Sequence, residues 1–356
     1  VAKFDLSTIQ PKHGPGATAQ RIMGNQKFVW RRWHGRLEPY FPLLGNAYPL
    51  SLAADLSVEP SDNGFVSSGA AEILERVTVV PMDEEDPVRV CLVPKTLKTP
   101  RVIAIEPVCM QFVQQGIRDW LYDELESYTL SAGHINFRDQ SVNQRLAITA
   151  SDRGQLATID LSDASDRVPA DVAMSMFDAN TSLKEAIAAC RSTSAELPDG
   201  RVIPELRKFA SMGSALCFPV EAMYFYTIVV MALLDFKQLS WTFRHLQEVI
   251  EDVYIYGDDI IVPSDAAVAV VEALQKYNCK VNVNKSFWTG KFRESCGVDA
   301  YDGKVVTPIY LRQMRPTSRR QARELISWVA TAHLFREKGY ELTAQLMLEE
   351  CERVVG

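Results

Sequence analysis

The sequence predicts an α+β fold in which a mostly antiparallel sheet is backed by helices. The first observation is a hairpin signal: residues 253–256 and 260–263 are β-branched and aromatic, and Gly257 opens a tight turn between them. The second is the order of elements around this hairpin, which runs strand, helix, hairpin, helix and strand. Because a short turn joins antiparallel strands, this order favours an antiparallel sheet with helices packed on it.

The N-terminal part of the chain is less regular. Residues 1–50 are rich in Gly, Pro, Arg and aromatic residues, and we expect irregular structure that packs over another part of the chain. A helix is predicted over residues 68–77. Strands are predicted over residues 89–93 and 101–105, on either side of a basic loop. Residues 110–126 repeat apolar side chains at helical spacing and predict a longer helix.

From residue 156 the hydrophobic pattern becomes more regular. Residues 156–159 predict a short strand that ends in Asp160. Residues 170–189 and 221–235 are predicted to be helical, and the second of these segments is strongly apolar.

The hairpin is followed by further helical and strand patterns. Residues 266–277 predict an amphipathic helix with Ser264 or Asp265 as its N-cap. The remaining predicted elements are a strand over residues 280–284 and helices over residues 319–336 and 341–354.

The composition is that of an ordinary globular protein. The 356 residues are 47% hydrophobic and 23% charged, and this length allows two or three sub-domains. The formal net charge of −7 argues mildly against a polyanionic partner. Because the basic residues are clustered, however, the net charge does not decide the partner.

The cysteine pattern and the hydropathy indicate the redox environment of the chain and whether it spans a membrane. Seven cysteines are scattered singly with no C-x-x-C spacing, which favours reduced thiols in a cytosolic protein over a disulfide framework or a zinc site. The N-terminus has no signal-peptide pattern, and the chain begins at Val1, so we expect a fragment or a processed product. The most apolar run, residues 222–234, is too short to span a bilayer; it predicts a buried helix, and we expect no membrane partner.

Paired carboxylates at the hairpin tip indicate a candidate cation site. Asp258 and Asp259 are adjacent at the end of an apolar hairpin, and carboxylate oxygens suit Mg²⁺ or Mn²⁺. An isolated Gly-Asp-Asp sequence is more typical of an ordinary polar turn than of a metal site. Asp160 favours the metal interpretation, because carboxylates from two strands can share a pair of ions. Such a pair would stabilise the attacking and the leaving oxygen of a phosphoryl displacement.

Basic residues supply candidate contacts for phosphates. Lys95, Lys98 and Arg101 form a basic turn that suits a nucleoside triphosphate or pyrophosphate, although a solvated basic hairpin has the same pattern. Ser211 and Gly213 precede the apolar helix, so the backbone there could approach a phosphate or ribose, or form a plain loop. A second basic set, mixed with aromatic residues, could follow a nucleic-acid backbone. Its members are Lys285, Lys291, Arg293, Arg312, Arg315, Arg319 and Arg320, around Phe287 and Trp288.

The order of these motifs resembles that of viral RNA-dependent RNA polymerases. The basic loop, aspartate strand, Ser/Gly loop, Gly-Asp-Asp hairpin and lysine strand are similar to motifs F, A, B, C and D. More narrowly, the chain resembles the catalytic replicase subunit of levivirus-type RNA bacteriophages. The blocks that carry this resemblance are residues 11–16, 93–95, 105–107, 139–145, 160–162, 211–213, 256–259 and 292–297.

The resemblance implies a right-hand polymerase that copies a phage RNA genome by two-metal nucleotidyl transfer from NTPs to an RNA 3′-OH, with release of pyrophosphate. It implies fingers over residues 1–155 (N-terminally incomplete), a palm over residues 156–310 with an inserted fingers segment at about 190–215, and a helical thumb over residues 311–356. It implies Mg²⁺, with Mn²⁺ as a substitute, and RNA template, RNA product and NTPs as partners. It also implies host elongation factors Tu and Ts and a ribosomal protein as partners. The implied location is the cytoplasm of an infected bacterium.

The resemblance also implies roles in catalysis. Asp160 and Asp258 would be the main metal ligands, with Asp259 assisting. Lys285 would protonate the departing pyrophosphate.

Substrate contacts are implied by the same motifs. Either Ser165 or Asp166 would meet the ribose 2′-OH, because Ser165 stands where many viral polymerases have Asp. Cys217 and Glu221 also depart from the animal-virus pattern, which has Thr and Asn there, although phage replicases share the Glu. The remaining implied contacts are Lys95, Lys98 and Arg101 to the triphosphate, Ser211 and Gly213 to the template side and ribose, and Phe292, Arg293 and Arg312 to RNA.

Two alternatives stay open at this level. A reverse transcriptase shares the palm and often a Tyr-x-Asp-Asp hairpin, but Gly257 and the phage-like blocks favour RNA synthesis. The second alternative is an inactive RNA-binding protein that keeps the palm. The presence of Asp160, Asp258 and Lys285 argues against it.

Overall fold

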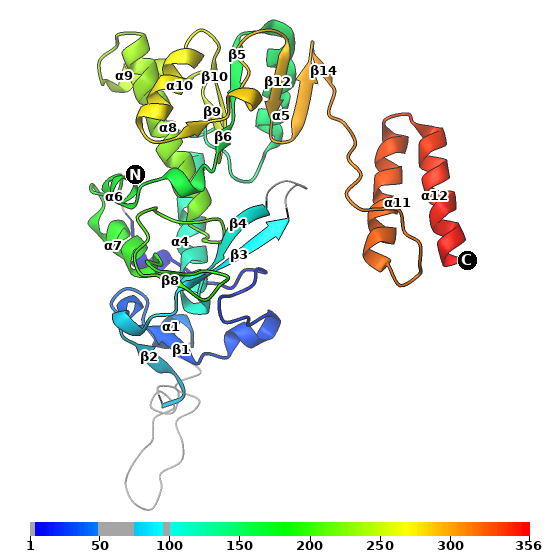
Figure 1. Ribbon diagram of the computed structural model, residues 1–356. Coiled ribbons are helices and arrows are strands. Elements are labelled where there is room, and N and C mark those ends of the chain that lie inside the picture. Colours follow the sequence, from blue (N-terminus) through cyan, green and yellow to red (C-terminus); the bar gives the residue numbers. More distant parts are fainter. Residues whose placement is uncertain (1–3, 49–74, 95–99) are drawn as a thin grey trace, which may run out of the picture.

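The computed structural model describes residues 4–48, 75–94 and 100–356. The polypeptide is a mixed α+β structure, as the sequence predicts (Figure 1). Most of the helix expected over residues 68–77 lies outside the described residues, as do Lys95 and Lys98.

The predicted hairpin is confirmed at the centre of a three-stranded antiparallel sheet. Strands β9 (Tyr254–Tyr256) and β10 (Asp259–Pro263) pair with Asp259 opposite Tyr256, and β5 (Leu156–Ile159) pairs on the other side of β10. All four residues of β5 are buried, which explains their continuous apolar character. The end of β5 and the hairpin tip therefore lie at the same edge of the sheet, since the strands are antiparallel neighbours.

Gly257 is required at the tip of this hairpin. Its φ is +62°, a conformation that side chains rarely adopt. A Cβ atom at this position would also lie 2.0 Å from a ring carbon of Phe218. The Phe218 ring packs edge-on against Tyr256 with centroids 5.2 Å apart, so the first turn of helix α8 (Cys217–Phe236) covers the hairpin.

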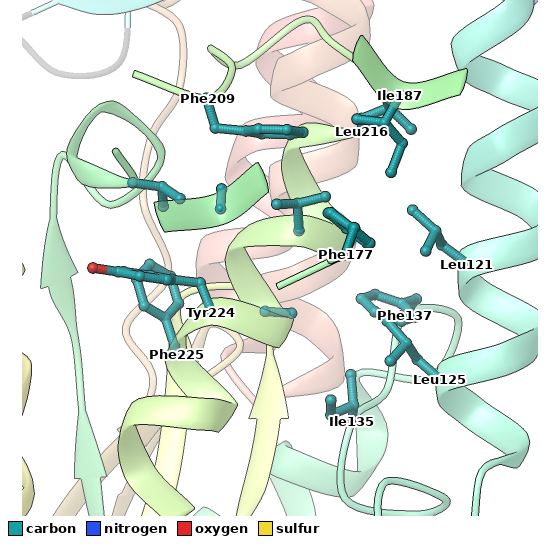
Figure 2. Packing of buried hydrophobic residues seen from close by; sticks show 14 of the residues in the cluster. Leu121, Leu125, Ile135, Phe137, Phe177, Ile187, Phe209, Leu216, Tyr224 and Phe225 are labelled. Carbon is teal, nitrogen blue, oxygen red and sulfur yellow. The ribbon is translucent and has the colours of Figure 1, made fainter. Parts of the chain in front are cut away.

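Helix α8 is the buried helix predicted from the apolar run, but it is longer than that run. Its 20 residues make it the one helix in the described part of the chain that is long and apolar enough to cross a bilayer, so the expectation that it is too short was wrong. In this structure 72% of its most apolar window is buried. Figure 2 shows Tyr224 and Phe225 of α8 in the same buried cluster as Ile135, Phe137 and, from α4 (Val108–Ser127), Leu125.

A second sheet carries the predicted basic hairpin. Strands β3 (Val88–Pro94) and β4 (Pro100–Ile105) pair antiparallel, which confirms the expected strand pair. The sheet has four strands in the order β4-β3-β7-β8, completed by β7 (Ala195–Glu196) and β8 (Val202–Ile203). Figure 1 shows the β3–β4 ribbon between the N-terminal elements and the sheet that holds the hairpin.

Several boundaries differ from the sequence prediction. Residues 170–189 form two helices, α6 (Ala170–Ser175) and α7 (Thr181–Cys190), because the side chain of Asn180 accepts a hydrogen bond from the Leu183 amide and starts a new helix. Two helices were not predicted, α5 (Ser141–Arg153) and α9 (Phe243–Ile250).

The helix after the hairpin begins later than expected. Helix α10 spans Ala267–Lys276 and its N-cap is Ala266, so the predicted cap at Ser264 or Asp265 was wrong. The strand expected over residues 280–284 is shorter: β11 (Lys280–Val281) pairs with β6 (Leu161–Ser162), and a 3₁₀ turn, η6 (Val283–Lys285), follows.

The C-terminal part consists of a small sheet and a helical pair. The sheet was not predicted and contains β12 (Phe292–Ser295), β13 (Val298–Tyr301) and β14 (Lys304–Val305). The predicted C-terminal helices are confirmed as α11 (Ala322–Glu337) and α12 (Glu341–Val355). Figure 1 shows this pair set apart from the rest of the chain, at the end of a connecting segment.

The N-terminal region has little regular structure, as expected. A parallel strand pair joins β1 (Arg32–His34) to β2 (Thr78–Val80). The remaining short elements are η1 (Leu6–Thr8), η2 (Gly24–Phe28), η3 (Gly35–Leu37), α1 (Leu43–Asn46), η4 (Met82–Glu84) and, further on, η5 (Ser165–Arg167).

Candidate active site

A cleft of about 440 Å³ opens where the ends of β5, β4, η6 and the hairpin meet. Two of the predicted carboxylate residues, Asp160 and Asp258, line it together. Four further residues predicted from the sequence line the same cleft: Arg101, Ser165, Asp166 and Lys285. The fold thus gathers residues that are up to 184 positions apart in the chain, from Arg101 to Lys285.

Hydrogen bonds with Ser286 and Asn282 hold Asp160 in place. Its backbone N–H donates to Ser286 Oγ at 3.1 Å, and its Oδ2 accepts a hydrogen bond from Asn282 Nδ2 at 2.8 Å. The Asn282 backbone N–H also donates to the Asp160 carbonyl at 2.9 Å. The second carboxylate oxygen, Oδ1, is outside these contacts, so the group keeps one oxygen for a ligand in the cleft.

The two hairpin carboxylates have different surroundings. Asp258 lines the cleft. Asp259 is the first residue of β10, and its Oδ1 accepts hydrogen bonds from Ser295 Oγ at 3.2 Å and from the Cys296 amide at 3.1 Å. Asp259 therefore faces the turn between β12 and β13.

Negative charge is concentrated around the hairpin. Burial raises the pKa of Asp160, and the neighbouring charge of Asp258 raises it further. Burial, together with Asp258 and Asp160, raises the pKa of Asp259 to about 6. Glu221 of α8 is buried beneath the same tip, and burial followed by the charge of Asp258 raises its pKa to about 8. A cation at the tip would relieve this repulsion, because it favours the charged form of each carboxyl group.

Lys285 lines the cleft opposite these acids. Its Nζ forms an ion pair with Glu294 Oε1 at 3.3 Å. Partial burial lowers the pKa of Lys285, but Glu294 and Asp160 outweigh burial, and the net pKa is raised. The ammonium group is therefore protonated at neutral pH and can donate a proton.

The candidate ribose-sensing residues both lie in the cleft. Ser165 is buried in η5 with 4% of its surface exposed. Asp166 is more exposed, and its Oδ1 forms an ion pair with Lys208 Nζ at 2.5 Å. Lys208 was not predicted from the sequence.

The Ser/Gly loop contributes its middle residue to the cleft. Met212 lines the cleft, whereas Ser211 lines a separate small cavity beside Glu106. Gly213 has φ of +127°, and a Cβ there would lie 2.0 Å from the Ala104 carbonyl oxygen of β4. Glycine is therefore required at residue 213 for close packing of this loop on β4.

Arg293 is a correction to the sequence prediction. Its side chain is 1% exposed, and its guanidinium donates to backbone carbonyl oxygens, at 2.6 Å for Leu156 and 2.7 Å for Phe292. The bond to Leu156 joins β12 to β5, and the buried guanidinium of Arg293 is not exposed to contact RNA. Phe292 is half-buried and packs edge-on against Phe287, with ring centroids 4.6 Å apart. Arg312 is exposed in the segment between β14 and α11.

Two residues that sequence reasoning missed hold the predicted ones in place. Asn282 orients Asp160, and Glu294 pairs with Lys285. The available signal was the polar alternation of residues 280–284, which placed Asn282 on a strand near the lysine. Nothing local pointed to Glu294, because its contact depends on β12 lying beside η6.

The donor set suits a magnesium ion. In the described residues, no three His, Cys, Asp or Glu side chains are grouped to hold a metal among themselves. Proteins that bind Mg²⁺ with a nucleotide usually supply one or two carboxylates, and the phosphates and water complete the shell. Asp160 and Asp258 on one cleft provide that minimum, and their mutual repulsion is the cost that a divalent cation would offset. Asp259 is held by Ser295 and Cys296, so it is less available as a ligand.

Residues 74–319 match the protein family described as RNA replicase, beta-chain. The RNA-directed RNA polymerase subunit beta of Escherichia virus Qbeta is 37% identical over 222 residues, which cover 62% of this chain and 34% of that protein. The RNA-directed RNA polymerase beta chain of Escherichia phage MS2 is 36% identical over 221 residues, which cover 62% of this chain and 37% of that protein. The matched region thus spans about a third of the length of these relatives. Among solved structures, the RNA-dependent RNA polymerase of a human picorbirnavirus superposes on 74% of this chain and 55% of that chain, with 12% identity and a TM-score of 0.49.

Proposed function

The chain belongs to the RNA replicase beta-chain family, and from this membership we propose that it is an RNA-directed RNA polymerase of the phage type. The observation that carries the proposal is the meeting of Asp160 and Asp258 in one cleft, from separate strands. The same cleft presents Arg101 and Lys285, whose positive charges suit the phosphates of an NTP.

We propose that the cleft lies in the palm of a right-hand polymerase. Residues 156–310 would form the palm, with an inserted fingers segment at about 190–215, and residues 1–155 would form the fingers. The α11–α12 pair, within residues 311–356, would form the thumb. The antiparallel sheet β5-β10-β9 with α8 and α10 behind it supports the palm assignment.

We propose Mg²⁺ as the cofactor, with Mn²⁺ as a substitute, held by Asp160 and Asp258, with Asp259 nearby. When bound, the ions would activate the RNA 3′-OH and neutralise charge on the triphosphate. Asn282 fixes one oxygen of Asp160 and leaves the other directed to the ligand side. This fixed geometry matters because phosphoryl transfer is catalysed mainly by positioning and charge.

The basic residues would act on the phosphates. Arg101, together with Lys95 and Lys98 of the loop before it, would bind the triphosphate. Lys285 would donate its proton to the pyrophosphate as it departs, and in the free enzyme Glu294 keeps this ammonium charged and directed. Either Ser165 or Asp166 would contact the ribose 2′-OH of the NTP, and the position of both residues in the cleft lining supports this role.

Partners and location follow from the same proposal. RNA template, RNA product and NTPs are the substrates and products. Host elongation factors Tu and Ts and a ribosomal protein would be partners in the cytoplasm of an infected bacterium. These partners rest on family membership alone.

The test is extension of an RNA primer on an RNA template in Mg²⁺ or Mn²⁺, by the chain alone and with elongation factors Tu and Ts. Asp258→Asn should reduce extension at least about 100-fold, since it removes a ligand charge from the cleft. Asp252→Asn, an exposed acid just before the same hairpin, is the matched control and should extend RNA as the parent does. Equal extension by Asp258→Asn would refute the metal assignment.

Substrate choice separates the remaining alternatives. A reverse transcriptase-like enzyme would incorporate dNTPs on the same template in preference to NTPs. An inactive RNA-binding protein would bind the template without incorporating either.

A further inference from the structure

A second groove lies on the N-terminal part of the chain, away from the catalytic cleft. Its volume is about 490 Å³. Three arginines line it, and none of the described residues that line it is acidic. The lining consists of Gln20, Arg21, Ile22, Gln26, Val29, Arg31, Arg32 and Val108.

The charges of two of these arginines face solvent. Arg21 and Arg31 are exposed, and no ion pair joins either of them to an acid in the described part of the chain. Arg32 differs, because its Nε pairs with Asp86 Oδ2 at 3.1 Å and its guanidinium also donates to the Glu84 carbonyl. Two unneutralised guanidinium groups in one groove repel each other, so an anion between them is favoured.

The backbone conformation at Arg21 is fixed by neighbouring residues. Arg21 has φ of +63°, which is strained for a residue with a Cβ. The turn is fixed by Thr18, whose buried hydroxyl accepts from the Ile22 amide at 2.9 Å and donates to the Ile22 carbonyl at 3.0 Å. A strained residue persists only where its surroundings determine it, and such strain is concentrated at binding sites.

Gln20 anchors the same turn to the rest of the chain. Its Nε2 donates to Asp86 Oδ2 at 3.0 Å, and its Oε1 accepts from the Val108 amide at 3.0 Å. The groove is therefore preorganised between the turn, β1 and the start of α4.

Exposed apolar side chains are neighbours of groove residues along the chain, and the ring of one of them, Phe28, packs edge-on against His13 with centroids 4.7 Å apart. Met23 and Phe28 stand at either end of η2, with 65% and 62% of their surface exposed. Gln26, between them, lines the groove. Arginines beside an exposed aromatic ring are the usual elements of single-stranded nucleic-acid binding, in which phosphates meet cations and bases stack on the ring.

A short segment of the chain, from β4 to the start of α4, leads from the catalytic cleft to the groove. Arg101 of β4 lines the cleft, and Val108, seven residues later, lines the groove. Seven residues span at most roughly 25 Å. A single RNA chain could therefore contact both places at once.

We infer that the groove is a second RNA-binding site, in which Arg21 and Arg31 contact the phosphates of a single-stranded RNA segment and Phe28 stacks on a base. This inference rests on the proposed function, because an RNA polymerase supplies the reason for RNA to be near the groove. It goes beyond that function in giving the chain a hold on RNA that does not depend on nucleotide or metal.

The test measures binding of a fluorescein-labelled single-stranded RNA by anisotropy, without NTP or divalent metal. The variant is Arg21→Gln/Arg31→Gln. The matched control is Lys237→Gln/Arg244→Gln, which removes the same charge from exposed residues at the end of α8 and on α9. The groove variant should bind about tenfold more weakly, and the slope of log affinity against log salt should fall by about 1.4, or 0.7 for each lost phosphate contact on a single strand.

Equal affinity and salt slope in the groove and control variants would overturn the inference, as would a parent chain that does not bind RNA. Competition by poly-glutamate as strong as that by RNA would also overturn it, because it would point to an acidic protein. Should the double variant fail to fold, photo-crosslinking of thiouridine-containing RNA to the parent chain decides instead. Crosslinks within residues 20–32 support the site, and crosslinks confined to other segments refute it.

These outcomes are separable from the fate of the proposed function. If the parent chain binds RNA through the groove but never extends a primer, the polymerase proposal fails and the binding site stands. If Asp258→Asn loses extension while the groove and control variants bind RNA with equal affinity, the polymerase proposal stands and the second RNA-binding site is refuted.

Discussion

Asp160 and Asn282 are joined by two hydrogen bonds, one from the Asn282 side chain to Asp160 Oδ2 at 2.8 Å and one from its backbone to the Asp160 carbonyl at 2.9 Å. The backbone bond continues the pairing of β6 with β11 and survives any substitution except proline, which has no backbone N–H. The side-chain bond alone fixes which oxygen of the carboxylate faces the cleft.

Asn282→Ala should therefore lower polymerase activity with little loss of stability. A hydrogen bond to a charged group contributes about 1.5–3 kcal/mol, so kcat should fall roughly 10- to 100-fold while the KM for NTP changes little. Steady-state extension kinetics measure this effect. Asn284→Ala, at an exposed position two residues further on, is the control and should leave kcat unchanged.

Gly257→Ala tests the close packing of the hairpin tip. The variant meets both an unfavourable φ and the Phe218 ring, so we expect a loss of about 1–3 kcal/mol in the free energy of unfolding. Gly290→Ala is the matched control, because its φ is +64° but no atom lies within 4 Å of the added Cβ. Urea unfolding should show the larger loss for Gly257→Ala; equal losses would mean that the Phe218 contact is unimportant.

The ion pair between Lys285 and Glu294 leads to a prediction about how the polymerase rate depends on pH. Lys285→Leu should reduce kcat about 100-fold, the usual contribution of a general acid. Glu294→Gln removes the acid that helps to raise the pKa of Lys285, so that pKa should fall. Since a general acid must be protonated, activity at high pH should then be lost at a lower pH than in the parent. A pH–rate profile whose alkaline limb does not move would argue that Lys285 is not the proton donor.

The burial of Glu106 leads to a prediction about how the free energy of unfolding depends on pH. It is fully buried and accepts a hydrogen bond from Ser192 Oγ at 2.5 Å, and burial raises its pKa to about 7. Between about pH 4.5 and pH 7 the folded chain keeps a proton that the unfolded chain has lost, so this group makes stability fall as pH rises. Glu106→Gln should remove that part of the pH dependence.

Unfolding free energies of the parent and of Glu106→Gln, measured at pH 5 and pH 7.5, test this prediction. The parent should lose more stability than the variant across the interval. Glu248→Gln, at an exposed position on α9, is the control and should follow the parent. Parallel curves for all three proteins would contradict the buried, protonated state of Glu106.

The sequence predicted those features that depend only on residues close to one another along the chain. The Gly257 turn, the end of β5 at Asp160 and the presence of α4 each depend on a few neighbouring residues, and each was predicted correctly. Helix α9 was missed although Thr242 caps it by accepting a hydrogen bond from the His245 amide, a signal that the sequence contains.

Non-local contacts could not be predicted. Charge in a sequence does not reveal burial, so Arg293 looked like an RNA contact although it is fully enclosed and bonded to carbonyl oxygens. Glu294 was missed because its partner, Lys285, is set by how η6 and β12 lie in space. Asn282 acquires its role from the pairing of β11 with β6, which brings it to Asp160 from 122 residues away.

The two bonds from Ser295 and Cys296 to Asp259 have a mechanical consequence. They bond the tip of the hairpin to the turn between β12 and β13, and Arg293 bonds β12 to β5. The small sheet is thus bonded to the sheet of the hairpin at two points, Asp259 and Leu156. A push on β12 or β13 from a neighbouring strand of nucleic acid would travel directly to the tip that carries Asp258.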